Sequence, residues 1–132
     1  METRRLFIII GSAMAGLAVA AGAFGAHALK DLVSPERLDV FDTAVRYQMM
    51  HALALLLVAA LAVDKESGLL RYAGVCFVLG TVLFSGSLYA LVLSGVTGFG
   101  AVTPLGGVSF LAGWGLIVGW GISRRRPPRT TA

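Results

Sequence analysis

Charged residues are scarce in this chain, and their scarcity excludes most soluble folds. Of the 132 residues, only 14% are Asp, Glu, Lys or Arg, whereas 57% are hydrophobic. A soluble domain carries about 25% charged residues. The apolar residues gather in long runs, and a chain of this length is normally one domain. The composition therefore predicts one integral membrane domain over residues 1–132.

The chain also has a single cysteine and no acidic residue inside an apolar run. Cys76 is the only cysteine, so neither an intrachain disulfide nor a cysteine metal cluster can form. No Asp or Glu lies inside an apolar run, which disfavours a proton or sodium relay. The two histidines have no acid or cysteine at their depth to complete a metal or haem site. We therefore expect no cofactor.

Two further functions are disfavoured by sequence context. The net charge of +4 owes much to the basic C-terminal tail that follows an apolar run, which is typical of a membrane helix and not of a nucleic-acid-binding protein. Ser85-Gly86-Ser87 and Gly22-Ala-Phe-Gly25 lack the strand context of a nucleophile elbow or a phosphate-binding loop. The sequence thus predicts that the protein has no nucleic-acid partner and is not an enzyme.

Four apolar stretches are each long enough to cross a bilayer, which takes about 20 helical residues. These stretches cover residues 6–28, 46–63, 69–93 and 104–122. The first also resembles a secretory signal, with Ala18-Val19-Ala20 as a cleavage site, but apolar character continues to Ala26. We therefore expect an uncleaved first helix and an all-α membrane protein, a four-helix transmembrane bundle.

The second helix is expected to begin in water, well before its apolar stretch. Ser34 suits the N-cap and Pro35 the first helical position. Leu38, Phe41 and Val45 then fall on one face, which predicts an amphipathic N-terminal extension. Thr103-Pro104 repeats the cap-and-proline pattern before the fourth stretch.

The distribution of basic residues predicts the orientation. With four spans, eight basic residues share one side with both termini, and three lie on the other. The eight are Arg4, Arg5, Lys65, Arg71, Arg124, Arg125, Arg126 and Arg129; the three are Lys30, Arg37 and Arg46. The positive-inside rule therefore places both termini in the cytoplasm.

Polar residues recur within the spans at similar depths in the outer half of the bundle. Counting about 1.5 Å of rise per residue from the outer boundary puts His51, Tyr89 and Ser109 at one level, with others close by. Hydrocarbon cannot solvate such groups, so they should face one another. We call the predicted set the polar layer: His27, Tyr47, Gln48, His51, Ser85, Tyr89 and Ser109.

The polar layer has two interpretations at this stage. It forms either hydrogen bonds that fix the helix register or a ligand-binding or proton-responsive site. The leading functional hypothesis is a non-enzymatic membrane protein, in contact with membrane lipids, whose bundle binds a lipid, a small apolar ligand or a partner helix. The alternative is a small transporter or transporter subunit that uses His27 and His51 as titrating groups. Gly115 and Gly119 form a G-x-x-x-G pair that faces either inward or a second subunit.

Four blocks of the sequence resemble one known family. They are Gly22-Ala-Phe-Gly-Ala-His27, Tyr47-Gln48 with His51, the segment from Leu79 to Tyr89, and Thr103-Pro104 followed by the segment from Gly106 to Trp114. In this order they are similar to the YgdD/YwdK-like family of small membrane proteins. The resemblance implies four spans, an uncleaved first helix and a bacterial inner membrane. It implies no activity and no binding residue.

Overall fold

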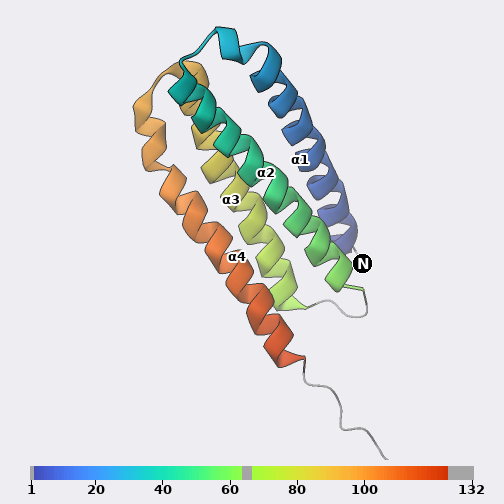
Figure 1. The fold of residues 1–132 in the computed structure, drawn as a ribbon. Coiled ribbons are helices and arrows are strands. Elements are labelled where there is room, and N and C mark those ends of the chain that lie inside the picture. The colour runs from blue at the N-terminus through green and yellow to red at the C-terminus, as the bar shows by residue number, and fades with distance from the viewer. Residues whose placement is uncertain (1, 64–66, 125–132) are drawn as a thin grey trace, which may run out of the picture.

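The computed structural model describes residues 2–63 and 67–124, which form four long helices with short connections (Figure 1). The helices are α1 (Glu2–His27), α2 (Pro35–Leu61), α3 (Gly68–Ser94) and α4 (Thr103–Ser123). The 3-10 turns η1 (Leu29–Asp31) and η2 (Thr97–Ala101) follow α1 and α3. Each long helix has the length and composition to cross a membrane, and the described residues contain no strand. The all-α, four-helix fold class is confirmed.

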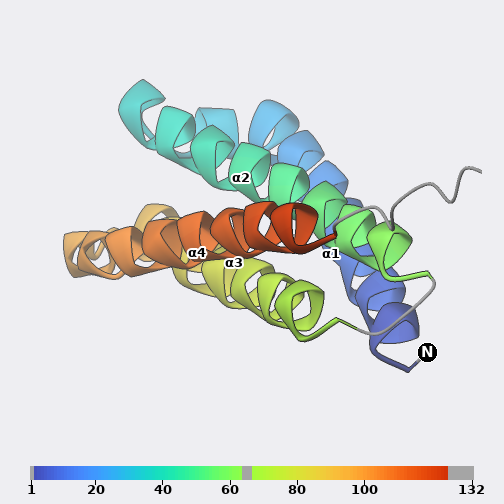
Figure 2. The ribbon, with the colours of Figure 1, turned by 90° about the horizontal axis from the view of Figure 1, so that it is seen from below.

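The helices pack mainly against their neighbours in sequence. α1 lies on α2, α2 on α3 and α3 on α4, so α1 and α4 occupy opposite flanks of the α2–α3 pair (Figures 1 and 2). The beginnings of α1 and α3 and the ends of α2 and α4 lie at one end of the bundle (Figure 1). This end carries Arg4, Arg5, Arg71 and Arg124, while Lys65, Arg125, Arg126 and Arg129 lie outside the described residues. Its cytoplasmic placement stays a prediction.

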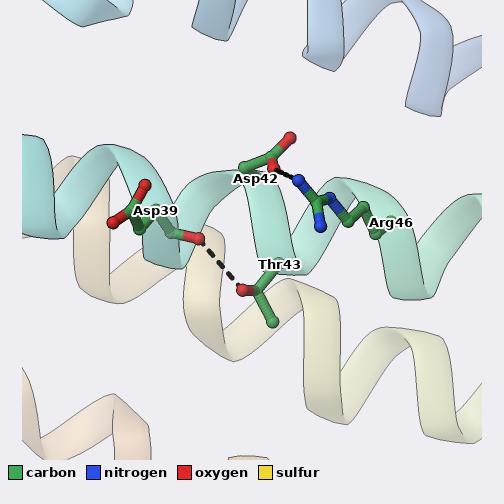
Figure 3. A network of polar contacts seen from close by, with 4 residues as sticks. All are labelled: Asp39, Asp42, Thr43 and Arg46. Atoms are coloured by element: carbon green, nitrogen blue, oxygen red, sulfur yellow. Dashed lines mark hydrogen bonds and ion pairs between the residues drawn. The ribbon is translucent and has the colours of Figure 1, made fainter.

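The N-terminal part of α2 has one buried and one exposed face. Ser34 caps the helix by accepting a hydrogen bond from the Arg37 backbone N–H at 3.3 Å, and Phe41 is buried against α1. On the exposed face, Asp42 and Arg46 pair at 2.6 Å, and the Thr43 hydroxyl donates to the Asp39 carbonyl (Figure 3). Since α2 has 27 residues, it is about 40 Å long, roughly 10 Å more than the hydrocarbon core. The extra length accommodates this extension.

The start of α4 differs from the sequence expectation. The helix begins at Thr103, with Val102 in the N-cap position and no side-chain cap. The Thr103 hydroxyl is instead within 2.7 Å of the Ser87 hydroxyl on α3. The connection through η2 folds back beside α3, so α4 begins level with Ser87 and not with the end of α3. Residues of α4 consequently lie deeper along α3 than the sequence suggested.

Glycine and phenylalanine together set how closely the helices approach. At four glycines a methyl group would collide with the ring or backbone of a phenylalanine on another helix, and at Gly25 it would lie a tight 3.1 Å from the Phe41 ring. At Gly113, for example, it would lie 2.6 Å from the buried Phe77 ring, well inside the usual carbon–carbon contact of about 3.5–4.0 Å. The pairs are Phe7 with Gly74, Phe41 with Gly25, Phe77 with Gly113, Phe84 with Gly106 and Phe110 with Gly80.

The G-x-x-x-G pair takes no part in these contacts. A methyl group at Gly115 or Gly119 would meet no atom within 4 Å. Both glycines therefore face away from the described bundle, and of the two predicted placements the inward one is excluded.

Candidate functional site

Gln48 joins three helices through its side-chain amide. Its Nε2 donates to the Met14 carbonyl of α1 at 2.9 Å, and its Oε1 accepts from the Tyr89 hydroxyl of α3 at 2.9 Å. Gln48 is only 7% exposed, so water does not compete freely for these bonds. A helix normally satisfies its own carbonyls, and here the Met14 carbonyl gains a second donor from a neighbouring helix.

His51 uses both ring nitrogens, and its partners fix its tautomer. Nδ1 is 2.8 Å from the Tyr47 carbonyl, and Trp114 Nε1 on α4 donates to Nε2 at 3.3 Å. A carbonyl only accepts and an indole N–H only donates. The proton therefore sits on Nδ1 and the ring is neutral. The imidazole also lies parallel to the Phe110 ring, with centroids 3.4 Å apart and planes 5° apart.

Two serine hydroxyls of the predicted polar layer also donate hydrogen bonds between helices. Ser85, which is 1% exposed, donates to the Ala44 carbonyl of α2 at 2.7 Å. Ser109 on α4 donates to the Cys76 carbonyl of α3 at 2.8 Å. In each bond the acceptor is a backbone carbonyl inside a helix, where it also accepts a hydrogen bond from its own helix. Among the described residues, no fully buried polar side-chain atom lacks a hydrogen-bond partner.

The structure distributes the predicted polar layer among separate places. Gln48 and Tyr89 form one network towards α1, and His51 forms another with Trp114 towards α4. Ser109 bonds at Cys76, more than three turns before Tyr89 and about 20 Å along the α3 axis, so His51, Tyr89 and Ser109 do not share one level. The late start of α4 beside Ser87 lowers Ser109 relative to Tyr89. His51 packs against Phe77, next to Cys76, so it lies near the level of Ser109 and away from that of Tyr89.

Two members of the predicted layer are exposed. His27 lies at the exposed end of α1, and its side chain makes no hydrogen bond within the described part of the chain. Tyr47 is 38% exposed; it contributes its backbone carbonyl to His51 and stacks its ring on Phe84 with centroids 4.4 Å apart. The two histidines therefore lie in different surroundings, one exposed and one buried.

Sequence reasoning missed the aromatic partners of His51. Trp114 and Phe110 are spaced one helical turn apart on α4, and at that spacing they share a face of the helix. This spacing was the available signal. Sequence gives no such signal for the acceptors, which are the backbone carbonyls of Met14, Ala44 and Cys76. A backbone carbonyl has the same chemistry at every residue.

An open cleft of about 340 Å³ adjoins His51 between α2 and α4. We call it the aromatic cleft. Four of its lining residues are aromatic, two are flexible or branched aliphatics, and one is glycine, in addition to His51. The lining residues are Tyr47, Met50, His51, Phe84, Gly107, Phe110, Leu111 and Trp114. Met50 and Leu111 are exposed to the surroundings of the bundle, which in a membrane are lipid, so the cleft opens towards the bilayer.

Metal chemistry finds little support in this arrangement. Within the described ranges, no group of three or more His, Cys, Asp or Glu side chains is placed to hold a metal ion. His51 Nε2, the nitrogen with the free lone pair in this tautomer, already accepts from Trp114. The site offers apolar surface, ring stacking and saturated hydrogen bonds.

Comparison with known proteins places this architecture in a family. Residues 21–107 match the family described as a protein of unknown function, DUF423, and these residues make up more than half of the chain. The chain belongs to this family. The match runs from the second half of α1 to the first turns of α4, so it includes Gln48, His51 and Tyr89 and ends before Trp114.

Named relatives agree with this assignment. The UPF0382 membrane protein YwdK of Bacillus subtilis is 49% identical over 100 residues, which cover 74% of this chain and 80% of the relative. The UPF0382 inner membrane protein YgdD of Escherichia coli K12 is 43% identical over 89 residues, 67% of this chain and 68% of the relative. No solved structure matches the chain. The YgdD/YwdK-like resemblance is confirmed, as is the bacterial inner membrane as the location of a multi-pass protein.

Proposed function

We propose that this protein is a non-enzymatic membrane protein whose aromatic cleft binds a small, ring-bearing apolar molecule from the bilayer. The cleft itself is the observation that carries the proposal. Its volume of about 340 Å³ falls at the lower end of ligand sites, which occupy about 300–1,000 Å³. Aromatic rings favour a flat partner, because stacked or edge-on ring pairs contribute about 0.5–1.5 kcal/mol beyond simple burial.

The state of His51 supports binding over catalysis. A general base needs a nitrogen that can take a proton from a substrate. Here Nε2 accepts from Trp114 and Nδ1 donates to Tyr47, so neither nitrogen is available without breaking a bond. The bond to Nε2 positions the Trp114 indole, and the imidazole stacks on the Phe110 ring, so both rings are held as walls of the cleft.

Other occupants and the transporter alternative have less support. A helix with side chains is about 10 Å across, so it cannot enter a cleft of about 340 Å³. A relay through His27 and His51 would need the two rings to communicate. His27 is exposed at the end of α1, whereas His51 is buried and engaged with α4.

The experiment uses Trp114 as a reporter inside the cleft. In a Trp120→Phe background Trp114 is the only tryptophan, and 1-bromonaphthalene is a flat apolar quencher of its fluorescence. The full chain is placed in lipid nanodiscs and titrated with this probe. Partition into lipid gives quenching that grows steadily with concentration, whereas binding in the cleft adds a component that saturates. We expect the saturating component.

A glycine pair on α4 provides the variant and its matched control. Gly107 lines the aromatic cleft, and Gly115 lies on the same helix outside it; a methyl group at either would meet no atom within 4 Å. Gly107→Leu should fill the cleft and weaken saturable quenching at least tenfold, and Gly115→Leu should leave it unchanged. If the two variants show the same saturable quenching, the proposal is wrong.

A further inference from the structure

A second cavity lies at the end of the bundle where α1 and α3 begin and α2 ends. It has a volume of about 180 Å³, and we call it the basic cavity. Its polar lining consists of two arginines and two hydroxyl-bearing residues, namely Thr3, Arg4, Ser67 and Arg71. By the charge count this end faces the cytoplasm, where the leaflet contains anionic lipids.

Neither arginine of the basic cavity has an acidic partner among residues 2–63 and 67–124. Arg4 donates from Nε to the Ala59 carbonyl at 3.2 Å, which anchors the side chain across the last turns of α2 and leaves its terminal nitrogens available. The Arg71 side chain makes no ion pair or hydrogen bond within the described part of the chain. By contrast, Arg46 on the opposite half of the bundle is paired with Asp42 at 2.6 Å.

The beginning of α3 adds to the positive field at the basic cavity. Ser67 occupies the N-cap position, but its hydroxyl does not cap the helix. The first backbone N–H groups of a helix have no intrahelical acceptor, and the positive end of its dipole lies there. Both arginines and this helix start therefore favour an anion at the same place.

The opposite wall of the cavity is apolar. Phe7, Val58 and Leu70 line it, and each is at most 5% exposed. An inorganic anion gains nothing from such a wall, whereas the glycerol and first acyl carbons of a lipid would bury apolar surface against it. The cavity thus combines a basic side with an apolar side, as a phospholipid combines a headgroup with acyl chains.

We propose that the basic cavity binds the phosphate group of a membrane phospholipid, with Arg4 and Arg71 as its ligands. A guanidinium matches phosphate because it can donate two parallel hydrogen bonds to two oxygens. The lipid would hold the ends of α1, α2 and α3 together through one headgroup. This site shares no lining residue with the aromatic cleft, so either proposal can fail without the other.

The test measures lipid binding to the full chain in a mild detergent by native mass spectrometry. The ligand is dihexanoylphosphatidylglycerol, and dihexanoylglycerol, which lacks the phosphate, is the control. We expect the phospholipid to bind at least tenfold more tightly. Arg4→Gln and Arg71→Gln should each weaken its binding about fivefold, as expected for loss of one cation near an anionic headgroup.

Arg5→Gln is the matched control variant. Arg5 adjoins Arg4 in sequence but does not line the basic cavity, so the control removes the same charge from the same end. It should bind the phospholipid as the unaltered chain does. An equal loss in Arg5→Gln, or equal affinities for the phospholipid and the glyceride, overturns the proposal. Arg71 is exposed, so Arg71→Gln disturbs no packing and its result reports on binding.

Inorganic phosphate distinguishes the two sources of a phosphate group. It should compete with the phospholipid only weakly, because it cannot use the apolar wall. If inorganic phosphate binds as tightly as the phospholipid, the lipid assignment is overturned and the cavity is a site for free phosphate.

Discussion

The hydrogen bond between Tyr89 and Gln48 offers the most direct test of how polar groups stabilise this bundle. Tyr89→Phe removes only the hydroxyl that donates to Gln48 Oε1 at 2.9 Å. Gln48→Leu removes that acceptor and also the bond to the Met14 carbonyl. We expect Tyr89→Phe to lower the free energy of unfolding by about 0.5–1.5 kcal/mol. Gln48→Leu should lower it by about 1.5–3 kcal/mol, because it also leaves the Tyr89 hydroxyl without its acceptor.

A double-mutant cycle isolates the bond itself. Hydrogen bonds between membrane helices couple by about 0.6 kcal/mol on average and by up to about 1.7 kcal/mol. Since Gln48 is 7% exposed, the coupling between the two substitutions should fall within this range. Unfolding is followed by circular dichroism as sodium dodecyl sulfate is added to detergent micelles. The unaltered chain, both single variants and the double variant are compared in the same detergent.

Tyr72→Phe is the control for loss of a tyrosine hydroxyl from α3. Tyr72 is 63% exposed and its hydroxyl makes no hydrogen bond within the described residues, so its loss should change stability by less than about 0.5 kcal/mol. A coupling between Gln48 and Tyr89 smaller than about 0.3 kcal/mol, which is the scatter of independent sites, would refute the reasoning. The buried amide would then contribute nothing through this contact.

Two further changes probe packing and surface charge by the same unfolding measurement. Gly113→Ala should cost about 1–3 kcal/mol, because its methyl group would press on the buried Phe77 ring, whereas Gly115→Ala should be neutral or stabilising by up to about 1 kcal/mol. Equal stabilities would show that α3 and α4 do not depend on close approach there. Asp42→Asn should cost less than about 0.5 kcal/mol and less still in high salt, because its pair with Arg46 is exposed. A cost above about 1 kcal/mol would contradict a solvated helix face.

The threading of this chain could be predicted because it depends on local composition. Long apolar runs exclude most soluble folds, and Ser34 with Pro35 marks the start of α2 through chemistry confined to one turn. The need of buried polar groups for partners also depends on the residue types alone. It predicts that Gln48, His51 and Tyr89 have hydrogen-bond partners, and each of them has one on another helix.

The relative heights and rotations of the helices could not be predicted in the same way. The height of α4 depends on how η2 folds back beside α3, and the number of residues in a connection does not determine that path. Helix rotation decides which glycines meet another helix, so Gly113 is enclosed while Gly115, two positions later, is open. The hydrogen bond between His51 and Trp114 depends on both the height and the rotation of α4 relative to α2.

The pairing of phenylalanine rings with glycines has a consequence for how this family can vary. Each pair joins residues on two different helices, so neither member can change size alone without a clash or a void. Among relatives, a larger residue at the position of Gly80 should occur together with a smaller residue at the position of Phe110. A phenylalanine at the second position should occur together with glycine at the first. Correlated substitution at such positions should therefore record which helices touch, even where the surrounding lipid-facing residues drift freely.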